Sequence, residues 1–517
     1  MANKQLFRTH AAVPATNAVN EAGGVAYALP AKQALAQYAA TGCLSGTYYA
    51  GAAEQLDKVL GLCAAVDVEF IAKTAIYARQ RGLMKDMPAL LVAVLAARDG
   101  ALCERVFDRV IDNGKLLRNF VQILRSGVTG RRSLGSRPKR MIQRWLDARS
   151  DAALFRASVG NDPSLADIIK MVHPKPAEAS RRALYAYLIG RPYDVAALPA
   201  CVASYEAYKA GLTKEVPNVN FQLLTSLDLD AAAWRSIAKD AGWQMTRMNL
   251  NTFARHGVFD KATMIKVIAK RLADPVAVKR ARAFPYQLMV AYTQAGAAVP
   301  KRVKDALQDA MEHALMNVPA LAGQVYVLPD ISGSMHSPAT GVRKGATSVV
   351  RCIDVAALIG AAILRTNRDA EVIPFSDHVV SCQLNPRDTV MTNARKLAKL
   401  PSGGTQCAAP LRELNRRKAK GDLVIFVSDN ESWIDGKRPR WSGTGVMEEW
   451  TKFKRRNPRA KLVCIDIQPY ATTQAPDRDD IINIGGFSDA VFDLIAAFAR
   501  GELSADHWIG VIDGIEL

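Results

Sequence analysis

Apolar residues recur at helical spacing from about residue 20 to residue 316, in short segments separated by glycine and proline. The stretch "DVEFIAKTAIYARQRG" is typical, because it places Phe70, Ile71, Ala75 and Ala78 on one face and ends in Gly82. Pro88 then opens "PALLVAVLAARDG". The pattern predicts two helices joined by a tight turn.

Further helical segments of the same style follow this pair along the chain. They are expected at 103–125, 138–158, 164–190, 200–212, 229–255 and 260–316. We find no fixed sequence period among them. Stacked helix pairs are typical of an α-solenoid, whose curved surface suits an extended ligand.

A different pattern begins near residue 322, where fully apolar runs alternate with helical stretches. Strands are expected at 324–329, 370–375, 422–428 and 460–467, and helices include 348–366 and 489–500. Apolar strands separated by helices indicate a parallel sheet covered on both faces. The predicted fold class is therefore α plus α/β, with a helical domain over 1–320 and a Rossmann-like, doubly wound domain over 321–517.

Charge separates the same two parts of the 517-residue chain. The net charge is +19, yet residues 321–517 hold 25 Lys and Arg against 23 Asp and Glu, which leaves +17 for residues 1–320. An excess confined to one part is the usual footprint of a polyanion binder. A general solubility charge is the alternative.

Other features of composition exclude several classes of protein. The eight cysteines are scattered without a C-x-x-C pair, which argues against a zinc site and a disulfide framework. No apolar run approaches the roughly 18 residues of a membrane span, and "MANKQLFRTH" lacks the apolar core of a signal peptide. We therefore expect a cytoplasmic protein.

Hard oxygen ligands cluster at the predicted strand ends. Asp330, Ser332 and Ser334 follow the first strand, Thr405 lies in "SGGTQC" before the third, and Asp429 follows the third. Ligands in open parallel sheets bind beyond the carboxyl ends of the strands. Two carboxylates and three hydroxyls suit Mg²⁺, with Mn²⁺ as the alternative. The chain has neither a G-x-x-x-x-G-K-[ST] loop nor G-x-G-x-x-G after a strand, which disfavours nucleotide binding.

This D-x-S-x-S set, with its downstream Thr and Asp, resembles the metal-ion-dependent adhesion site of von Willebrand factor A domains. The resemblance implies that a partner's carboxylate completes the metal shell and that the domain binds rather than catalyses. A metal-dependent phosphodiesterase is disfavoured because hydrolysis needs a base or a second metal. Only Asp330, Asp429, Glu431 and His336 are available for that role.

The remainder of the chain resembles the Ro autoantigen family, whose N-terminal part is the TROVE module. The resemblance rests on "GGVAYALPAKQALAQYAATGCLSGTYY" (23–49), "DIIKMVHPKP" (167–176), "AFPYQLMVAY" (283–292) and the metal-site run. It implies a ring of HEAT-like repeats closed by the A domain, as in a bacterial Ro-related protein, and we expect a monomer.

The resemblance also implies RNA partners. Y-like small RNA would bind the basic outer surface, and the single-stranded 3′ ends of misfolded RNA would enter a central hole. A 3′–5′ exoribonuclease such as polynucleotide phosphorylase is the implied protein partner, in RNA quality control. The competing hypothesis is a metal-dependent protein adaptor without an RNA function.

Candidate RNA-binding residues come first from the H-x-K-P motif. His173 matches the family's RNA-binding histidine, and Lys170 and Lys175 flank it. Arg156 matches one of two basic residues that the family carries in the preceding helix, whereas Gly160 stands at the place of the other. His173 as a core or capping residue is the alternative.

Two further segments are candidates from their own composition. "RSGVTGRRSLGSRPKRMIQR" (125–144) holds seven basic residues and no acid, and its candidates are Arg131, Arg132, Arg137, Lys139 and Arg140. "TRMNLNTFARHG" (246–257) contributes Arg247, Asn249, Arg255 and His256. A solvated face is the alternative for the first segment, and ordinary core with capped ends for the second.

Overall fold

The structure is a computed structural model that describes residues 13–42, 44–281, 285–314, 318–341, 350–367, 369–434, 443–486, 488, 490–503 and 507–517. The chain forms two compact units. One comprises Met1–Leu62, Phe284–Gln287 and Leu315–Gly514, and the other comprises Cys63–Ala283, Leu288–Ala314 and Ile515–Leu517. We refer to them as the sheet unit and the helical unit.

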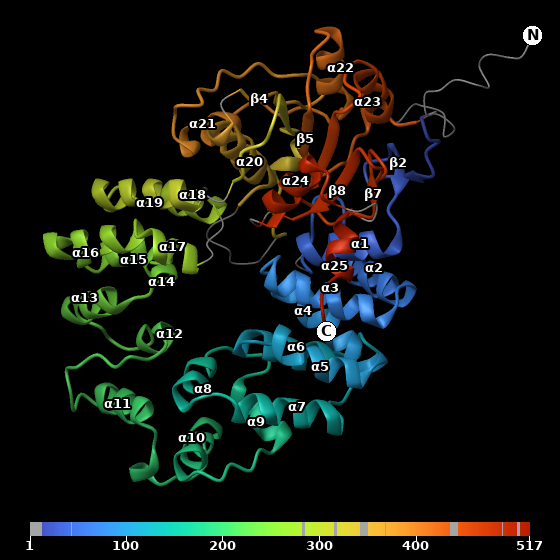
Figure 1. Ribbon diagram of the computed structural model, residues 1–517. Helices are drawn as coiled ribbons and strands as arrows, with labels where there is room; N and C mark the ends of the chain where they lie inside the picture. The colour runs from blue at the N-terminus through green and yellow to red at the C-terminus, as the bar shows by residue number, and fades with distance from the viewer. Residues whose placement is uncertain are drawn as a thin grey trace, which may run out of the picture. The chain divides into compact units, whose positions relative to one another are not determined.

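The sheet unit is built on five parallel strands in the order β4-β3-β5-β6-β8 (Figure 1). Their bounds are Val325–Pro329 (β3), Glu371–Val372 (β4), Leu423–Ser428 (β5), Lys461–Asp466 (β6) and Ile481–Gly485 (β8). The four predicted strands are all present. Strand β8 was not predicted, because Asn483 and the closing glycine interrupt its apolar run.

Helices cover both faces of this sheet, as the apolar strands predict. Tyr326, Phe426 and Cys464 belong to a buried cluster with Trp450 and Phe453 of α23 (Gly445–Arg456), and α22 (Ala408–Arg416) adds Leu411 and Leu414. Helix α20 (Cys352–Thr366) contacts β3, β4 and β5, and is buried along nearly its whole length. The predicted fold class, helical repeats together with a helix-covered parallel sheet, is therefore confirmed.

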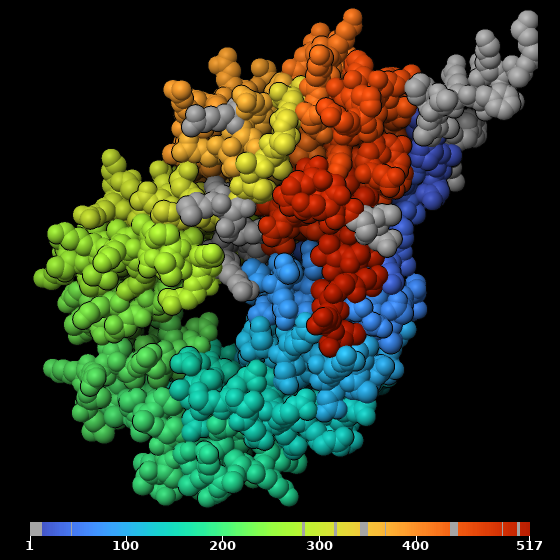
Figure 2. All heavy atoms as spheres, viewed as in Figure 1, coloured from blue at the N-terminus to red at the C-terminus, as the bar shows by residue number. Residues whose placement is uncertain are grey.

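The N-terminal segment is also part of the sheet unit. Strands β1 (Ala18–Val19) and β2 (Val25–Ala28) form a small antiparallel sheet with β7 (Thr472–Thr473), and helix α1 (Ala31–Thr41) packs against β8. Figure 2 shows the blue atoms of this segment against red and orange atoms of the C-terminal part. The compact units thus differ from a division at residue 320, because this pairing joins segments more than 400 residues apart.

Gly24 permits a close approach between these segments, because a Cβ at this position would overlap the carbonyl oxygen of Ser432. We expect Gly24→Ala to destabilise the sheet unit by roughly 1–3 kcal/mol through overpacking. Gly61 lies within α2 (Ala52–Ala65) with open space around its Cβ direction. Gly61→Ala is therefore the control and is expected to stabilise by roughly 0.5–1 kcal/mol. Thermal unfolding measures both, and a harmless Gly24→Ala would contradict the close contact.

The helical unit begins with five well-defined helices. They are α3 (Val68–Gln80), α4 (Asp86–Arg98), α5 (Gly100–Val110), α6 (Gly114–Ser126) and α7 (Ser136–Asp147). Asp67, Asp99 and Asn113 cap α3, α5 and α6 with side-chain oxygens that accept backbone N–H groups. The Trp145 indole of α7 donates to the Ile111 carbonyl across 2.6 Å, so a buried polar group also ties neighbouring helices together.

The remaining helices of this unit range from four to fourteen residues. They are α8 (Asp151–Ala157), α9 (Leu165–Val172), α10 (Ala179–Ile189), α11 (Ala200–Lys209), α12 (Phe221–Leu224), α13 (Ala231–Asp240), α14 (Trp243–Met248), α15 (Leu250–Arg255), α16 (Ala262–Leu272), α17 (Pro275–Ala281), α18 (Pro285–Gln294) and α19 (Lys301–Ala314). The sheet unit also contains α21 (Val390–Leu397), α24 (Ala490–Arg500) and α25 (His507–Asp513). Among the described residues, no helix combines the length and apolar character needed to cross a membrane.

Candidate metal centre and candidate nucleic-acid interface

The two predicted metal-binding carboxylates follow neighbouring strands. Strands β3 and β5 pair in parallel with Pro329 opposite Val427, and the Asp330 amide donates to the Val427 carbonyl across 3.0 Å. Asp429 comes directly after β5. Because the carboxyl ends of parallel strands meet at one edge, both acids lie at that edge. They are almost fully buried, with exposed fractions of 0% and 3%.

The loop after β3 brings its two serines to the same edge. The Ser332 amide donates to Asp330 Oδ1 across 2.8 Å, and a short 3-10 turn, η3 (Gly333–His336), follows. The hydroxyls of Ser332 and Ser334 lie 3.3 Å apart and are buried. Alternation along this loop therefore directs its oxygens inward, as the D-x-S-x-S spacing predicts.

Thr405 reaches this edge on the loop that precedes α22. The Gly333 amide donates to the Gly403 carbonyl across 3.0 Å, which joins that loop to the serine loop. The Thr405 carbonyl accepts from the Trp433 amide at 3.3 Å, which joins it to the segment after β5. Thr405 itself is 2% exposed. The structure therefore brings the three separated sequence motifs to one place.

The electrostatics of this edge favour a cation. Burial, and then the charge of Asp429, raise the pKa of Asp330 above its usual range, and burial likewise raises the pKa of Asp429. The Ser428 hydroxyl donates to Asp330 Oδ2 across 2.6 Å and opposes part of the rise for that group. Two buried carboxylates at close range are unfavourable together when ionised, unless a proton or a metal ion neutralises them.

The donor set fits a hard divalent ion. Asp330, Asp429, Ser332, Ser334 and Thr405 would supply only oxygen, which Mg²⁺ and Mn²⁺ prefer. Within the described part of the chain, no group of three or more His, Cys, Asp or Glu side chains is arranged to hold a metal. Binding here would therefore depend on the hydroxyls as well as the two acids. The assignment of the five ligands stays a prediction.

Two further acids lie beside this site, and neither was predicted as a metal ligand, although Glu431 was named for the disfavoured phosphodiesterase. Asp466 ends β6, is buried, and accepts a hydrogen bond from the Asn430 side chain. Glu431 is fully buried, and burial followed by the charge of Asp429 raises its pKa well above the usual value. Its Oε2 accepts from the Ala22 amide across 3.1 Å, whereas Oε1 has no hydrogen-bond partner among the described residues. One sequence signal could have identified Asp466, because this residue stands at the end of an apolar strand, as Asp330 does.

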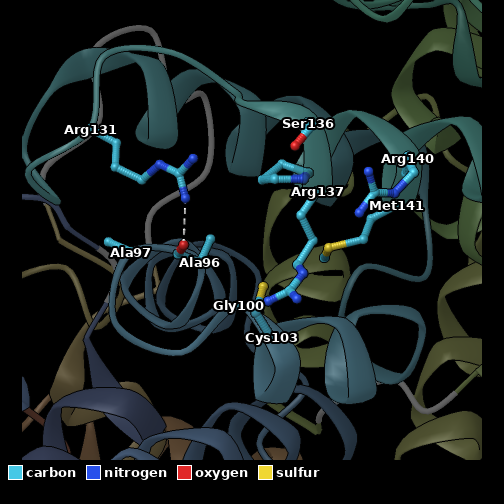
Figure 3. A pocket seen from close by; sticks show the side chains of 10 residues that line it. Ala96, Ala97, Gly100, Cys103, Arg131, Ser136, Arg137, Arg140 and Met141 are labelled. Atoms are coloured by element: carbon cyan, nitrogen blue, oxygen red, sulfur yellow. Dashed lines mark hydrogen bonds between the residues drawn. The ribbon is translucent and has the colours of Figure 1, made fainter.

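In the basic segment 125–144, some cationic side chains have partners within the protein and others have none in the described structure. Arg131 donates to the carbonyls of Ala96 and Leu134 across 2.6 and 3.2 Å, so its guanidinium holds the loop on α4 (Figure 3). Arg137 extends over Gly100 and lies 3.8 Å from Glu104. The side chains of Arg132, Lys139 and Arg140 are exposed and have no ion pair or hydrogen bond in the described structure. Of the five candidates in this segment, these three are the ones available to a ligand.

A surface cavity of about 390 Å³ lies at the start of α7. It is lined by Ala96, Ala97, Gly100, Cys103, Arg131, Ser136, Arg137, Pro138, Arg140 and Met141. Figure 3 shows Arg131, Arg137 and Arg140 around it, from the loop and from α7. Gly135 precedes the helix and supplies no side-chain cap. Three arginines therefore line a space that has no acidic residue in its lining.

His173 lies on a helix that packs against α7. It ends α9 in the left-handed conformation, with φ of 51°, and its side chain is exposed together with those of Lys170 and Lys175. Gln143 of α7 donates to the Val172 carbonyl across 2.6 Å, next to His173. The histidine is therefore a helix-capping residue through its backbone, as the alternative held, while its imidazole faces solvent and is available for binding.

Arg156 is exposed at the end of α8, and its carbonyl accepts from the Asn220 side chain. Gly160 has φ of +119°, and the Arg118 guanidinium of α6 lies directly over it. Arg118 also donates to the Ala157 carbonyl across 2.9 Å. The place where the family carries a second basic residue thus receives positive charge from another helix, which the sequence does not reveal.

In the segment 246–257, most of the candidate side chains already have partners within the protein, which the composition does not indicate. Arg247 donates to Gln244, and the Asn249 amide side chain donates to the Met245 carbonyl across 2.8 Å. His256 stacks on Trp234 with ring centroids 4.2 Å apart. Arg255 is exposed and has no partner in the described structure. Of these four candidates, Arg255 is the most available to an external ligand.

Comparisons with known proteins agree with this architecture. Residues 324–499 match the model of a protein family described as "Ro60 vWA domain". The RNA-binding protein RO60 of Deinococcus radiodurans is 26% identical over 94% of this chain and 95% of its own length. The RNA-binding protein RO60 of Caenorhabditis elegans is 24% identical over 51% of this chain and 41% of its own.

A solved structure supports the fold across nearly the whole chain. The crystal structure of the Deinococcus radiodurans Ro (RSR) protein superimposes with a TM-score of 0.60 at 22% identity, covering 92% of this chain and 100% of that one. At this identity the likeness establishes the fold alone. Together with the matched domain over residues 324–499 and the relative aligned over nearly the full length, it shows that the chain is similar to Ro proteins along almost all of its length.

Proposed function

We propose that this protein binds RNA and does not act as an enzyme. Two relatives, one of them similar over nearly the full length, are named RNA-binding proteins. The single structural observation that carries the proposal is the set of free cations on α7 and the loop before it, Arg132, Lys139 and Arg140, beside a cavity ringed by three arginines. Phosphate groups are the ligand that such a surface suits.

The arrangement favours backbone contacts over base reading. Cations at the exposed N-terminal end of a protein helix can contact successive phosphates of an RNA backbone. The major groove of an A-form RNA helix is deep and narrow, so side chains cannot reach the base edges there. His173 and Lys170 on the packed neighbour α9 extend the same surface. We therefore propose that a structured, Y-like small RNA is bound here. By family resemblance, single-stranded 3′ ends of misfolded RNA would be a second class of ligand.

The sheet unit would serve the complex as a docking module. Asp330, Asp429, Ser332, Ser334 and Thr405 would hold Mg²⁺, or Mn²⁺, and the bound ion would supply a Lewis-acidic centre for a carboxylate ligand. We propose a 3′–5′ exoribonuclease such as polynucleotide phosphorylase as the protein partner in RNA quality control, acting in the cytoplasm. The chain itself would hold RNA without cleaving it.

The test is binding of a labelled stem-loop RNA with a single-stranded 3′ tail, titrated at 50 to 300 mM salt. Affinity is expected to fall linearly in log–log form, with a slope of about −0.7 to −0.9 per phosphate contacted. Affinity independent of salt would contradict the proposal. Equal affinity for a neutral polymer would do so too, and would leave a metal-dependent protein adaptor as the better interpretation.

The imidazole of His173 provides a local test of the outer surface. We expect His173→Asn to weaken stem-loop RNA binding roughly 10- to 100-fold, because one hydrogen bond to a charged group is worth about 1.5–3 kcal/mol. Asn tolerates the left-handed backbone that this position requires, so folding is expected to be preserved. A filter-binding titration measures the loss. Equal weakening of an unstructured oligonucleotide would count against a site specific for structured RNA.

A further inference from the structure

The N-terminal segment contacts the segment that follows β5, directly beside the predicted metal ligands. Asn20 Nδ2 donates to the Ser432 carbonyl across 2.8 Å, and the Ala22 amide donates to Glu431 Oε2 across 3.1 Å. Gly24 lets the two backbones meet there. Residues 20–24 therefore anchor the N-terminal segment next to Asp429, within the sheet unit.

Residues 47–49 of the same segment contact the metal edge itself. The Tyr470 hydroxyl donates to Thr47 Oγ1 across 3.4 Å, and the rings of Tyr49 and Tyr470 meet edge to face with centroids 5.9 Å apart. Burial and the nearby Asp429 raise the pKa of the Tyr49 phenol, and a hydrogen bond with the Ser334 side chain partly opposes this rise. The Tyr49 hydroxyl thus lies beside two predicted metal ligands.

The two adjacent tyrosines of this segment have different surroundings. The side chain of Tyr48 is 59% exposed, whereas Tyr49 is partly buried between Tyr470 and the metal edge. The five predicted ligands are only 0–4% exposed with the segment in this position. An outside carboxylate, which needs an open approach to the ion, is therefore separated from the site by this chain's own residues.

We propose that residues 47–49 form an intrachain clasp, in which Tyr49 covers the face through which the metal site would receive a partner's carboxylate. The proposal rests on the metal site of the proposed function, and it changes the role of that site. With the clasp in place, a bound ion stabilises the N-terminal segment. A protein partner gains access only after Tyr49 is displaced.

The clasp is tested by titrating Mg²⁺ calorimetrically into the full chain, in 100 mM sodium acetate or in 100 mM sodium chloride. Acetate is the carboxylate probe. The affinity of the wild-type chain and of Tyr48→Ala is expected to be the same in both salts. Tyr49→Ala is expected to bind Mg²⁺ at least threefold more tightly in acetate. Acetate-dependent affinity in the wild-type chain would show an open face and overturn the proposal, and so would Mg²⁺ binding by none of the three.

Hydrogen exchange on the unmodified chain supplies a second readout that needs no Tyr49 variant. Mg²⁺ is expected to slow amide exchange in residues 44–50 several-fold, and Asp429→Ala should abolish that slowing. Unchanged exchange in a chain that binds Mg²⁺ would overturn the clasp. RNA affinity measured on the same samples reports on the proposed function separately, because the free cations belong to the helical unit. Its loss would leave the acetate and exchange results interpretable.

Discussion

Replacing Arg132, Lys139 and Arg140 together by Ala is expected to weaken binding of a tailed stem-loop RNA on the order of 100-fold at 0.15 M salt. Each cation that neutralises a phosphate contributes roughly fourfold to fivefold at this ionic strength through counterion release. The salt slope should also become shallower by about two to three. Folding should be preserved, because these side chains are exposed and have no partners in the described structure.

Arg131 is left in place because its guanidinium satisfies two backbone carbonyls. The matched control removes the same charge elsewhere, at Arg416, Lys452 and Arg455, which line a basic hollow between α22 and α23. Two of these cations are already paired, with Glu413 and Glu449. If both triple variants weakened RNA binding equally, RNA affinity would depend only on the total charge of the protein. The surface formed by Arg132, Lys139 and Arg140 would then not be a specific RNA-binding site.

Mg²⁺ is expected to raise the unfolding temperature of the sheet unit by roughly 5–10 °C at pH 8. An ion present at 100 times its Kd stabilises the folded state by about 2.7 kcal/mol, and each kcal/mol moves the Tm of a unit of this size by about 2–4 °C. Scanning fluorimetry with Mg²⁺ or with a chelator measures the shift. Asp330→Asn should remove the response, because one of the two carboxylates is lost.

The Mg²⁺ effect should decrease as the pH falls. Burial and Asp429 raise the pKa of Asp330 from 3.8 to about 7 in the folded, metal-free chain. The protonated carboxyl therefore stabilises the fold at low pH, and that contribution is lost as the pH rises from about 4 through 7. Mg²⁺ replaces the proton above this window and competes with it below. At pH 5.5 the shift should fall to less than half its value at pH 8.

Asp466→Asn is the matched control for this experiment, because Asp466 is a buried acid at the end of the adjacent strand β6. It should retain most of the Mg²⁺ response. If Asp466→Asn and Asp330→Asn lost the response equally, the ion would be sensing the general negative charge of the strand ends. An unchanged Tm at every pH would refute the metal site.

Local patterns in the sequence predict those features that depend on neighbouring residues. The apolar runs of β3, β5 and β6 and the ligand spacing after β3 are of this kind, and the structure brings Asp330, Thr405 and Asp429 together as the pattern indicates. The pairing of β2 with β7 is invisible to such patterns. It joins two short segments of ordinary composition that are separated by most of the chain. Tyr49 belongs to the same N-terminal segment, so its position beside the metal edge is also not predicted by local patterns.

The orientation of long side chains is also hidden from sequence. Arg131 and Arg132 are neighbours of the same type in one basic loop, yet one guanidinium binds backbone carbonyls and the other is exposed. From the sequence, Gly160 indicates that a basic residue is missing at this place. In the structure, the Arg118 guanidinium lies over Gly160 and supplies a positive charge there. Composition therefore identifies a basic surface, while three-dimensional contacts decide which of its charges a ligand can use.

The pairing of β2 with β7 has a consequence for the order of folding during synthesis. Residues 25–28 leave the ribosome 444 residues ahead of their partner strand, residues 472–473. At about 5–20 residues per second, the first strand waits roughly 20–90 s for its partner. The helical unit, encoded between them, can assemble during that interval. The edge of β2 that pairs with β7 therefore has no partner strand during that interval.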